Sequence, residues 1–183
     1  MKVCYFLEKN DHLIFQLYQA SKSERIRKKR FHSQIRPAVI YWIAGLYFFW
    51  RGSVWVTLFL IIVGVLWFIY YPLWERGHYV RHYQSFIDEK FPAKSQVESE
   101  VNLDFDETYI HCKNYLGESK VLLSAIQEII ELDTLILIKL SDAESVILPK
   151  ERIENIEEVK SYLKTLAERL NIPYQQELDW QWK

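Results

Sequence analysis

Two long apolar runs, separated by a single charged residue, constrain this chain more than any other feature of its sequence. No Asp, Glu, Lys or Arg occurs between Pro37 and Trp50 or between Gly52 and Trp74, and Arg51 alone stands between the two runs. The chain is 50% hydrophobic, yet its mean hydropathy is -0.14, so the apolar residues are concentrated in one region. Concentration on this scale is typical of membrane-spanning helices.

The second apolar run, Val54 to Trp74, is 21 residues long, close to the roughly 20 residues that cross about 30 Å of hydrocarbon as a helix. Thirteen of its residues are Leu, Ile, Val or Phe, and their combined insertion free energy is on the order of -5 kcal/mol. Pro72 lies near its end, beside Tyr70 and Tyr71, and such aromatic residues favour the interface. This run predicts a membrane-spanning helix.

The first run, Ile35 to Trp50, has 16 residues and reaches only about 24 Å at 1.5 Å per residue, so it is marginal as a span by itself. Its neighbour favours insertion as a helical hairpin, with Arg51, Gly52 and Ser53 in the turn. A re-entrant or interfacial helix is the alternative. A signal peptide is disfavoured, because no small-residue cleavage site follows and the second run begins at once.

Lys and Arg residues flank both apolar runs but are nearly absent from the turn, which predicts that both termini are cytoplasmic. Residues 1–94 carry 14 Lys and Arg against 6 Asp and Glu, a balance of +8, whereas residues 95–183 carry 9 against 18, a balance of -9. A basic part near anionic lipid and an acidic part in water fit this segregation. No nucleic-acid fold signature accompanies the basic residues, so nucleic acid is not an expected partner. We expect a multi-pass protein of the cell (inner or plasma) membrane that contacts anionic lipid headgroups through Lys28, Lys29, Arg30, Arg36, Arg76 and Arg81.

From Val97 onward the pattern changes to short alternating stretches broken by turn residues, which is typical of antiparallel strands. Asn155 then begins an amphipathic helix, with Glu158 in the capping-box position, and Asn171 and Pro173 end it. The predicted fold is a membrane α-helical hairpin plus an α+β domain, in which an antiparallel meander is closed by a C-terminal helix. The expected strands cover residues 101–105, 108–113, 120–123, 126–132, 135–140 and 145–148.

A bent meander of about six strands closed by one helix is the order of elements in a pleckstrin-homology-like β-barrel. The chain resembles the YcxB-like family of bacterial membrane proteins, in which a short N-terminal segment precedes two membrane helices and a cytoplasmic pleckstrin-homology-like domain. Tyr5 to Leu17 and Val146 to Ile153 carry this resemblance. The second stretch looks like the family's apolar-Pro-Lys signature, which implies a strand-to-helix joint at Leu148, Pro149 and Lys150. The resemblance implies architecture and location more than activity.

These observations divide the chain into five parts, each with its own expected role. Within the first part, Val3 to Leu7 is expected to be a strand, and a helix is expected to start near Asn10. The parts are an N-terminal cytoplasmic strand, helix and basic segment (1–34), a two-helix transmembrane hairpin (35–74), a juxtamembrane helix (75–94), the cytoplasmic pleckstrin-homology-like domain (95–173) and a tail (174–183).

Motifs for catalysis, cofactors or metals are missing from the sequence. It has no Walker sequence, no GxSxG, no zinc motif and only five glycines, so we expect neither an enzyme nor a bound cofactor. His78 and His82 stand four apart, as metal ligands on a helix do, but no third ligand is evident and we interpret them as interfacial. Cys4 and Cys112 would share the reducing cytoplasm and stay free thiols.

Two functional hypotheses follow. The favoured one is a non-catalytic, membrane-anchored interaction module whose domain binds a protein partner or a second copy of itself. The alternative is an auxiliary or regulatory subunit of a membrane transporter or enzyme complex that docks through the hairpin. Phosphoinositide binding is not expected, because the first hairpin loop carries Asp104, Asp106 and Glu107 where phosphate would need Lys and Arg.

Overall fold

The computed structural model describes residues 1–90, 99–114, 117–140 and 144–182. The chain divides into two compact units. We call residues 1–15 and 87–181 the sheet domain, and residues 16–86 with 182–183 the helical unit.

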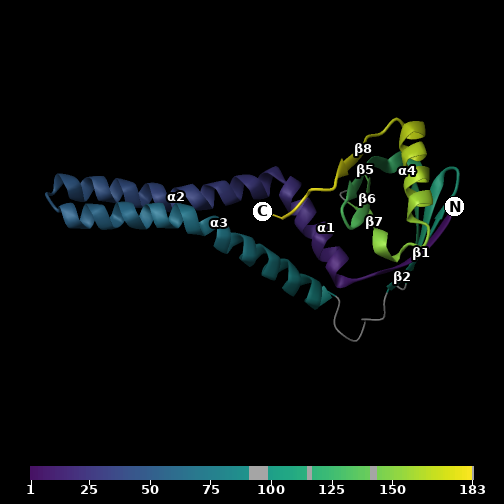
Figure 1. The fold of residues 1–183 in the computed structure, drawn as a ribbon, viewed down its shortest axis with the longest axis horizontal. Coiled ribbons are helices and arrows are strands. Elements are labelled where there is room, and N and C mark those ends of the chain that lie inside the picture. The colour runs from purple at the N-terminus through teal and green to yellow at the C-terminus, as the bar shows by residue number, and fades with distance from the viewer. Residues whose placement is uncertain (91–98, 115–116, 141–143, 183) are drawn as a thin grey trace. The chain divides into compact units, whose positions relative to one another are not determined.

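The helical unit is built on two long helices, and a shorter one precedes them: α1 (Lys9–Lys22), α2 (Glu24–Trp50) and α3 (Val54–Lys90). The hydroxyl of Ser23 caps α2 by accepting a hydrogen bond from the backbone N–H of Ile26. Gly52 has a φ of +81°, a conformation that favours glycine, and it lies in the tight turn between α2 and α3. Figure 1 shows these two helices side by side as a helical hairpin.

Small residues at seven-residue spacing let the two helices of the hairpin approach closely. The Thr57 hydroxyl donates across the helix interface to the carbonyl of Gly45 at 3.1 Å. Gly64, seven residues after Thr57 on α3, faces Ala38, seven residues before Gly45 on α2. A Cβ on Gly64 would lie 2.6 Å from the indole nitrogen of Trp42. Small residues and a hydroxyl bond at the helix contact are typical of helices packed in lipid.

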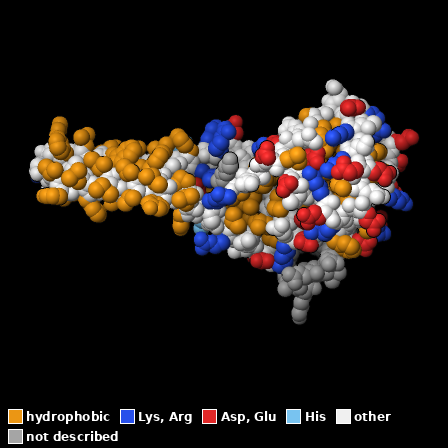
Figure 2. Space-filling view, in the orientation of Figure 1, with side chains coloured by type: hydrophobic (Ala, Val, Ile, Leu, Met, Phe, Trp, Pro, Cys, Tyr) orange, Lys and Arg blue, Asp and Glu red, His pale blue; other side chains and the backbone are white. Residues whose placement is uncertain are grey.

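Within the described residues, one helix is long and apolar enough to cross a membrane, and that helix is α3. Its most apolar window has a mean hydropathy of 2.3. Helix α2 does not meet the same standard, because its uncharged part begins only at Pro37, after the basic segment. The structure therefore shows a hairpin with one candidate span, where the sequence predicts two. Hydrophobic side chains cover the surface of the hairpin (Figure 2).

The sheet domain consists of two separate four-stranded sheets and the helix α4 (Ile156–Leu170). The predicted closed barrel is not seen, since no strand ladder among the described residues joins the two sheets. The first sheet has the order β1 (Lys2–Leu7), β2 (Ser99–Phe105), β3 (Tyr109–Asn114) and β4 (Gly117–Leu122), and the second has the order β7 (Ser145–Pro149), β6 (Leu135–Leu140), β5 (Ile126–Leu132) and β8 (Tyr174–Glu177).

Strands β1 and β8 join the sheets from parts of the chain that the sequence assigns elsewhere. β1 pairs antiparallel with β2 over six residue pairs, from Lys2 opposite Asp104 to Leu7 opposite Ser99. Residues 174–177, predicted to lie in a tail, form β8 and pair parallel with β5. The domain thus takes its first strand from before the hairpin and its last strand from after α4.

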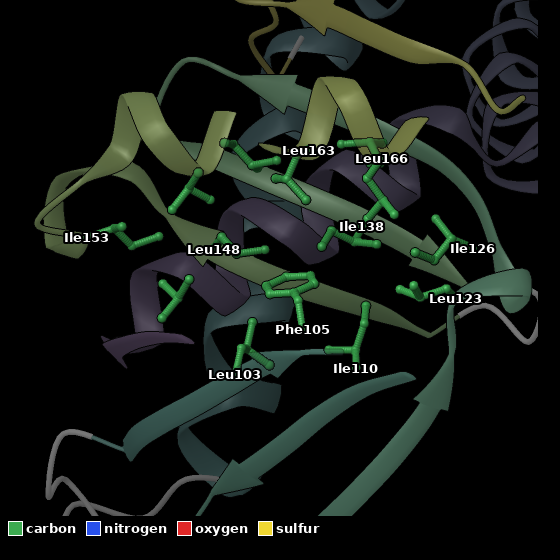
Figure 3. Close-up of a cluster of buried hydrophobic side chains, with 14 of the residues drawn as sticks. Leu103, Phe105, Ile110, Leu123, Ile126, Ile138, Leu148, Ile153, Leu163 and Leu166 are labelled. Carbon is green, nitrogen blue, oxygen red and sulfur yellow. The ribbon is translucent and has the colours of Figure 1, made fainter. Parts of the chain in front are cut away.

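The core of the sheet domain is formed by the inward faces of the strands and the apolar face of α4. Figure 3 shows side chains from β2, β3, β6 and β7 meeting those of α4, among them Phe105, Ile138, Leu148 and Leu163. In β2 alternate residues, Val101, Leu103 and Phe105, point into this core, whereas β6 is buried on both of its faces. Burial of this apolar surface is the domain's main source of stability.

The ends of α4 only partly follow the sequence pattern. Asn171 adopts the left-handed conformation, with a φ of 54°, and ends the helix as predicted. Asn155 precedes the helix, but its side chain makes no capping hydrogen bond, so the predicted capping box with Glu158 is wrong.

Candidate functional site

The predicted lipid contacts all lie on α2 and α3 in the helical unit. Lys28 pairs with Glu24 at 3.2 Å, and Arg81 donates to the carbonyl of Gly77 in the preceding turn of α3. Exposed side chains at these positions are sterically available to headgroups, and lipid contact by them stays a prediction. The exposed members of the set are Lys28, Lys29, Arg36, Arg76 and Arg81.

Arg30 differs from the other five because its charge is engaged within the helical unit. Its Nε lies 3.2 Å from a carboxylate oxygen of Glu75, which is only 6% exposed. Its guanidinium also lies 5.8 Å from the ring centroid of Tyr79 and 5.1 Å from that of Trp182. A buried carboxylate needs such a partner, so Arg30 links α2 to α3 at a position where the sequence predicts a headgroup contact.

Trp182, the next to last residue of the chain, is an unexpected member of this cluster. Its indole N–H donates to the carbonyl of Arg76 at 3.4 Å, and its ring centroid lies 5.8 Å from that of Tyr79. No local pattern marks Trp182 in the sequence, because its partners are about a hundred residues away along the chain.

The strand-to-helix signature lies in the sheet domain, and its three residues have different surroundings. Leu148 is fully buried in the core, and Pro149 ends β7. Lys150 begins a short 3₁₀ helix, and its Nζ lies 2.9 Å from a carboxylate oxygen of Glu131 on β5. The joint therefore directs the chain toward α4 while its lysine reaches back to the second sheet.

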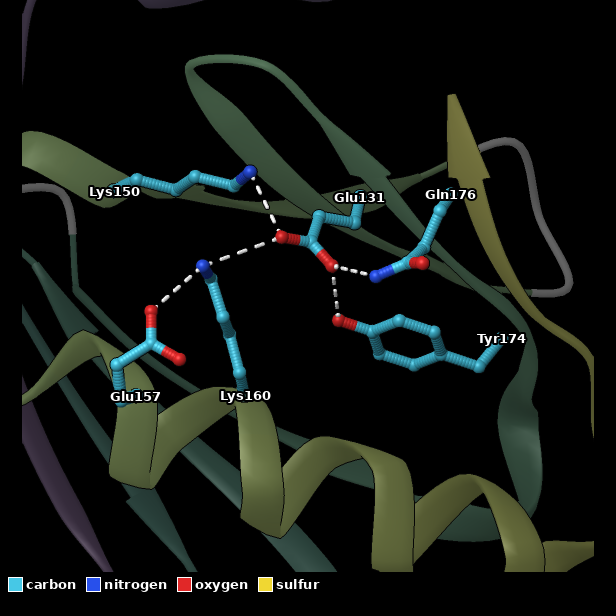
Figure 4. Close-up of polar contacts among 6 residues, drawn as sticks. All are labelled: Glu131, Lys150, Glu157, Lys160, Tyr174 and Gln176. Atoms are coloured by element: carbon cyan, nitrogen blue, oxygen red, sulfur yellow. Dashed lines mark hydrogen bonds and ion pairs between the residues drawn. The ribbon is translucent and has the colours of Figure 1, made fainter. Parts of the chain in front are cut away.

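Glu131 is buried and is the centre of a polar cluster, the Glu131 network, which draws on β5, β8, α4 and the 3₁₀ helix (Figure 4). Besides the signature lysine, its carboxylate binds the Tyr174 hydroxyl and the Gln176 amide, which donate hydrogen bonds of 2.9 Å each. Lys160 of α4 lies 3.4 Å from the carboxylate and also pairs with Glu157. Both carboxylate oxygens are thus occupied, and the network fastens β8 and α4 to β5.

The protonation state of Glu131 follows from these contacts. Burial by itself would raise the pKa of its carboxyl group. The hydrogen bonds from Lys150, Gln176 and Tyr174, with the charge of Lys150, outweigh burial and lower the pKa of Glu131 to about 2. Burial, with the hydrogen bond to Glu131, raises the pKa of Tyr174. Glu131 is therefore ionised and Tyr174 neutral at physiological pH.

Arg152 is the centre of a second polar cluster, which joins the signature stretch to the start of the chain. Its guanidinium pairs with Asp11 and with Glu8, the latter at 2.8 Å, and its Nε donates to the carbonyl of Phe6 at 2.9 Å. Asp11 is 4% exposed and also accepts from the backbone N–H of Glu8, which fixes the start of α1. We call these four residues the Arg152 clamp.

The sequence patterns did not identify Glu131, Asp11 and Arg152 as members of buried polar contacts. A single acid near the apolar end of β5 is a usable signal for Glu131, because a buried carboxylate requires partners. Asp11 and Arg152 carry no such local signal, since 141 residues separate them along the chain.

The remaining histidine, cysteine and aspartate candidates lie outside both polar clusters. His78 stacks on Trp74 with the ring centroids 5.2 Å apart. Both cysteines are free thiols. Asp104, predicted to lie in the first hairpin loop, is instead on β2, where it stands opposite Lys2 of β1 and pairs with it at 3.7 Å. Among the described residues, no group of three or more His, Cys, Asp or Glu side chains is placed to hold a metal ion.

An apolar helical hairpin and a two-sheet domain with its own helix place the chain in the class of α+β proteins with a candidate membrane helix. The family model described as "YcxB-like protein" matches residues 105–166, so the predicted resemblance to the YcxB-like family is confirmed for this part of the chain. The matched stretch runs from the end of β2 into α4, within the sheet domain. No curated protein and no solved structure gives a significant match.

Proposed function

We propose that this is a multi-pass protein of the cell (inner or plasma) membrane, in which α2 and α3 cross the bilayer as a hairpin and the sheet domain is cytoplasmic. The observation that carries this proposal is the pairing of β1 with β2. β1 precedes the hairpin and β2 follows it, yet six residue pairs join them in one sheet. Both strands must therefore lie on the same side of any membrane that the intervening chain crosses.

Because of this pairing, α3 can cross the membrane only if a second segment of the intervening chain crosses back. If α3 spans the bilayer alone, β1 and β2 are left on opposite sides and cannot form their ladder. An even number of crossings restores the ladder, and α2 is the available second helix. The bond from Thr57 to Gly45 and the close contact at Gly64 support α2 as the partner of α3 in lipid. A hairpin that lies in the interface is the alternative that also preserves the ladder.

The cytoplasmic orientation is supported by the distribution of positive charge. Lys and Arg cluster before α2 becomes apolar and occur again after α3 ceases to be apolar, and Figure 2 shows blue side chains where the hydrophobic surface ends. Positively charged flanks stay on the cytoplasmic side. Arg51 alone marks the opposite end of the hairpin, where its long side chain can extend to the headgroups.

Cysteine accessibility in the full-length protein tests the topology. One variant keeps exposed Cys4 and carries Cys112→Ser, and the other carries Ser53→Cys with both native cysteines replaced by Ser. A membrane-impermeant maleimide, applied to vesicles of known orientation, should label Cys4 from the cytoplasmic side and position 53 from the opposite side. Labelling of both from one side would overturn the transmembrane hairpin.

We further propose that the sheet domain is a non-catalytic interaction module of pleckstrin-homology-like architecture, which binds a protein partner or a second copy of the chain. Support for the architecture comes from the order β1 to β4 in one sheet, β5 to β7 in the other and a helix after them. Support for a non-catalytic role comes from Glu131, whose strongly perturbed carboxyl group is saturated by partners that hold the fold together.

Site-specific photocrosslinking in cells separates the module from the alternative of a subunit that docks by its hairpin. The full chain carries a benzophenone amino acid at Ser161 on α4, at Tyr109 on β3 or at Leu58 on the hairpin, all of which are exposed. The module proposal expects protein crosslinks from at least one of the two sheet-domain positions. Crosslinks from Leu58 alone would favour the subunit and overturn the module.

A further inference from the structure

A groove of about 850 Å³ runs between β1 and α4 within the sheet domain. Residues 1–6 line one side of it, and residues of the segment from Arg152 to Thr165 line the other. Val3, Tyr5 and Val159 contribute apolar surface, and each of them is buried in the core. The groove therefore has an apolar floor, with a strand on one side and a helix on the other.

The strand that borders the groove has a free hydrogen-bonding edge. Met1 and Phe105 exchange both backbone hydrogen bonds, at 2.8 and 2.9 Å. Because such pairs alternate along an antiparallel ladder, Lys2, Cys4 and Phe6 direct their N–H and C=O groups away from β2. β1 is the outermost strand of its sheet, and within the described part of the chain no strand pairs with this edge.

The bond from Arg152 to the carbonyl of Phe6 agrees with this direction of the edge. Lys2 and Cys4, whose backbone groups point the same way, both line the groove. An extended peptide lying there can add a strand to the sheet and satisfy these groups, the mode of recognition called β-augmentation. The edge thus favours an extended occupant over a helical one.

The charge of the groove favours a basic occupant. Its two cationic side chains, Lys2 and Arg152, are already paired with acids that lie outside it. Glu154 and Glu158 line the same groove and are exposed, and no cation among the described residues forms an ion pair with either. The uncompensated charge on the helix side is therefore negative.

We infer that this groove docks an extended basic segment of a partner protein, which pairs with the edge of β1 and places its positive side chains against Glu154 and Glu158. The inference rests on the proposed role of the sheet domain as an interaction module, and it names the surface and the chemistry of the partner. The backbone hydrogen bonds of the added strand contribute affinity that depends little on the partner's sequence, and the two carboxylates favour Lys and Arg side chains.

Fluorescence anisotropy with the full-length protein in non-ionic detergent tests this inference. The probe is a labelled peptide, Lys-Val-Lys-Val-Lys-Val-Lys, and the reference probe is the same peptide N-methylated at every backbone amide, which cannot pair as a strand. We expect saturable binding of the first peptide and its loss with the second. The Glu154→Gln, Glu158→Gln double variant should weaken binding about tenfold. The Glu151→Gln, Glu168→Gln double variant, an equal charge change at exposed positions outside the groove, should not.

The outcomes separate this inference from the proposal on which it rests. If neither peptide binds, or if both bind equally, the inference that the groove docks an extended basic segment is overturned. A dimer of the full chain that dissociates in the double variant identifies a second copy as the occupant and also overturns the inference. Crosslinks from Tyr109 that appear although the peptide fails to bind would leave the module proposal standing without the groove.

Discussion

The side-chain amide of Gln34 on α2 donates a hydrogen bond to the backbone carbonyl of Phe68 on α3, with the two atoms 3.1 Å apart. In a regular helix this carbonyl would bind the N–H of the residue four positions later. That residue is Pro72, which has no N–H. Gln34 therefore satisfies the carbonyl that Pro72 leaves unpaired, and α3 runs through the proline without a break.

Replacing this donor should weaken the hairpin only while the proline is present. Gln34→Leu leaves the carbonyl of Phe68 without its partner and should destabilise the hairpin by about 1 kcal/mol. In a Pro72→Ala background, the helix itself can satisfy that carbonyl, so the same substitution should cost much less. Unfolding of the full chain in mixed micelles, compared over the four proteins, measures the difference; equal losses in both backgrounds would contradict the assignment.

Gly64 should be intolerant of a side chain because Trp42 and the backbone of Ala38 occupy the space where it would extend. Gly64→Leu should separate α2 from α3 and lower the stability of the hairpin by about 1–3 kcal/mol. Gly77→Leu makes the same change elsewhere on α3, where a Cβ would meet only the guanidinium end of Arg81 at 3.7 Å, and it is the matched control. Unfolding midpoints in detergent test this, and similar effects of the two substitutions would count against a close contact at Gly64.

The Glu131 network should make the sheet domain sensitive to acid. The folded-state pKa of Glu131, about 2, lies below its ordinary value of 4.5. The stabilisation is therefore fully present above about pH 4.5 and is lost as the pH falls toward 2, with a total on the order of 3 kcal/mol. Glu131→Gln should be less stable than the unmodified protein at pH 7, and the gap should shrink between pH 4.5 and 2.

Denaturant unfolding at a series of pH values measures that gap. Glu168→Gln serves as the control, since its carboxylate is exposed on α4 and belongs to no part of the network. A gap for Glu131→Gln that stays constant from pH 7 to pH 2 would show that the carboxylate charge does not stabilise the fold.

The Arg152 clamp predicts a strong loss of stability when its cation is removed. Arg152→Met leaves the carboxylate of Asp11 buried without its charged partner and should destabilise the sheet domain by about 3 kcal/mol. Asp11→Asn in the same chain should restore part of this loss, because the buried charge is then absent. Arg169→Met, at an exposed position in the last turn of α4, is the control. Additive effects of the Arg152 and Asp11 substitutions would argue against direct coupling.

Local patterns in the sequence were sufficient for much of the fold. The length of the second uncharged run predicts α3 as a candidate span. The short stretches between turn residues predict β2, β3, β5, β6 and β7 within a few residues of their observed bounds. The amphipathic character of α4 and its end at Asn171 are also confirmed. These features depend on neighbours within about one turn or one strand, so the chain's own order of residues contains the information.

Only the tertiary structure decided which distant segments meet. It showed that β1 belongs to the sheet domain, that the expected tail supplies β8, and that the two sheets stay separate instead of closing into a barrel. It also identified the ion-pair partners of Arg30, Glu131 and Arg152. Each of these contacts joins groups that are far apart along the chain, and neither periodicity nor charge counting carries the register or geometry that selects one partner from many.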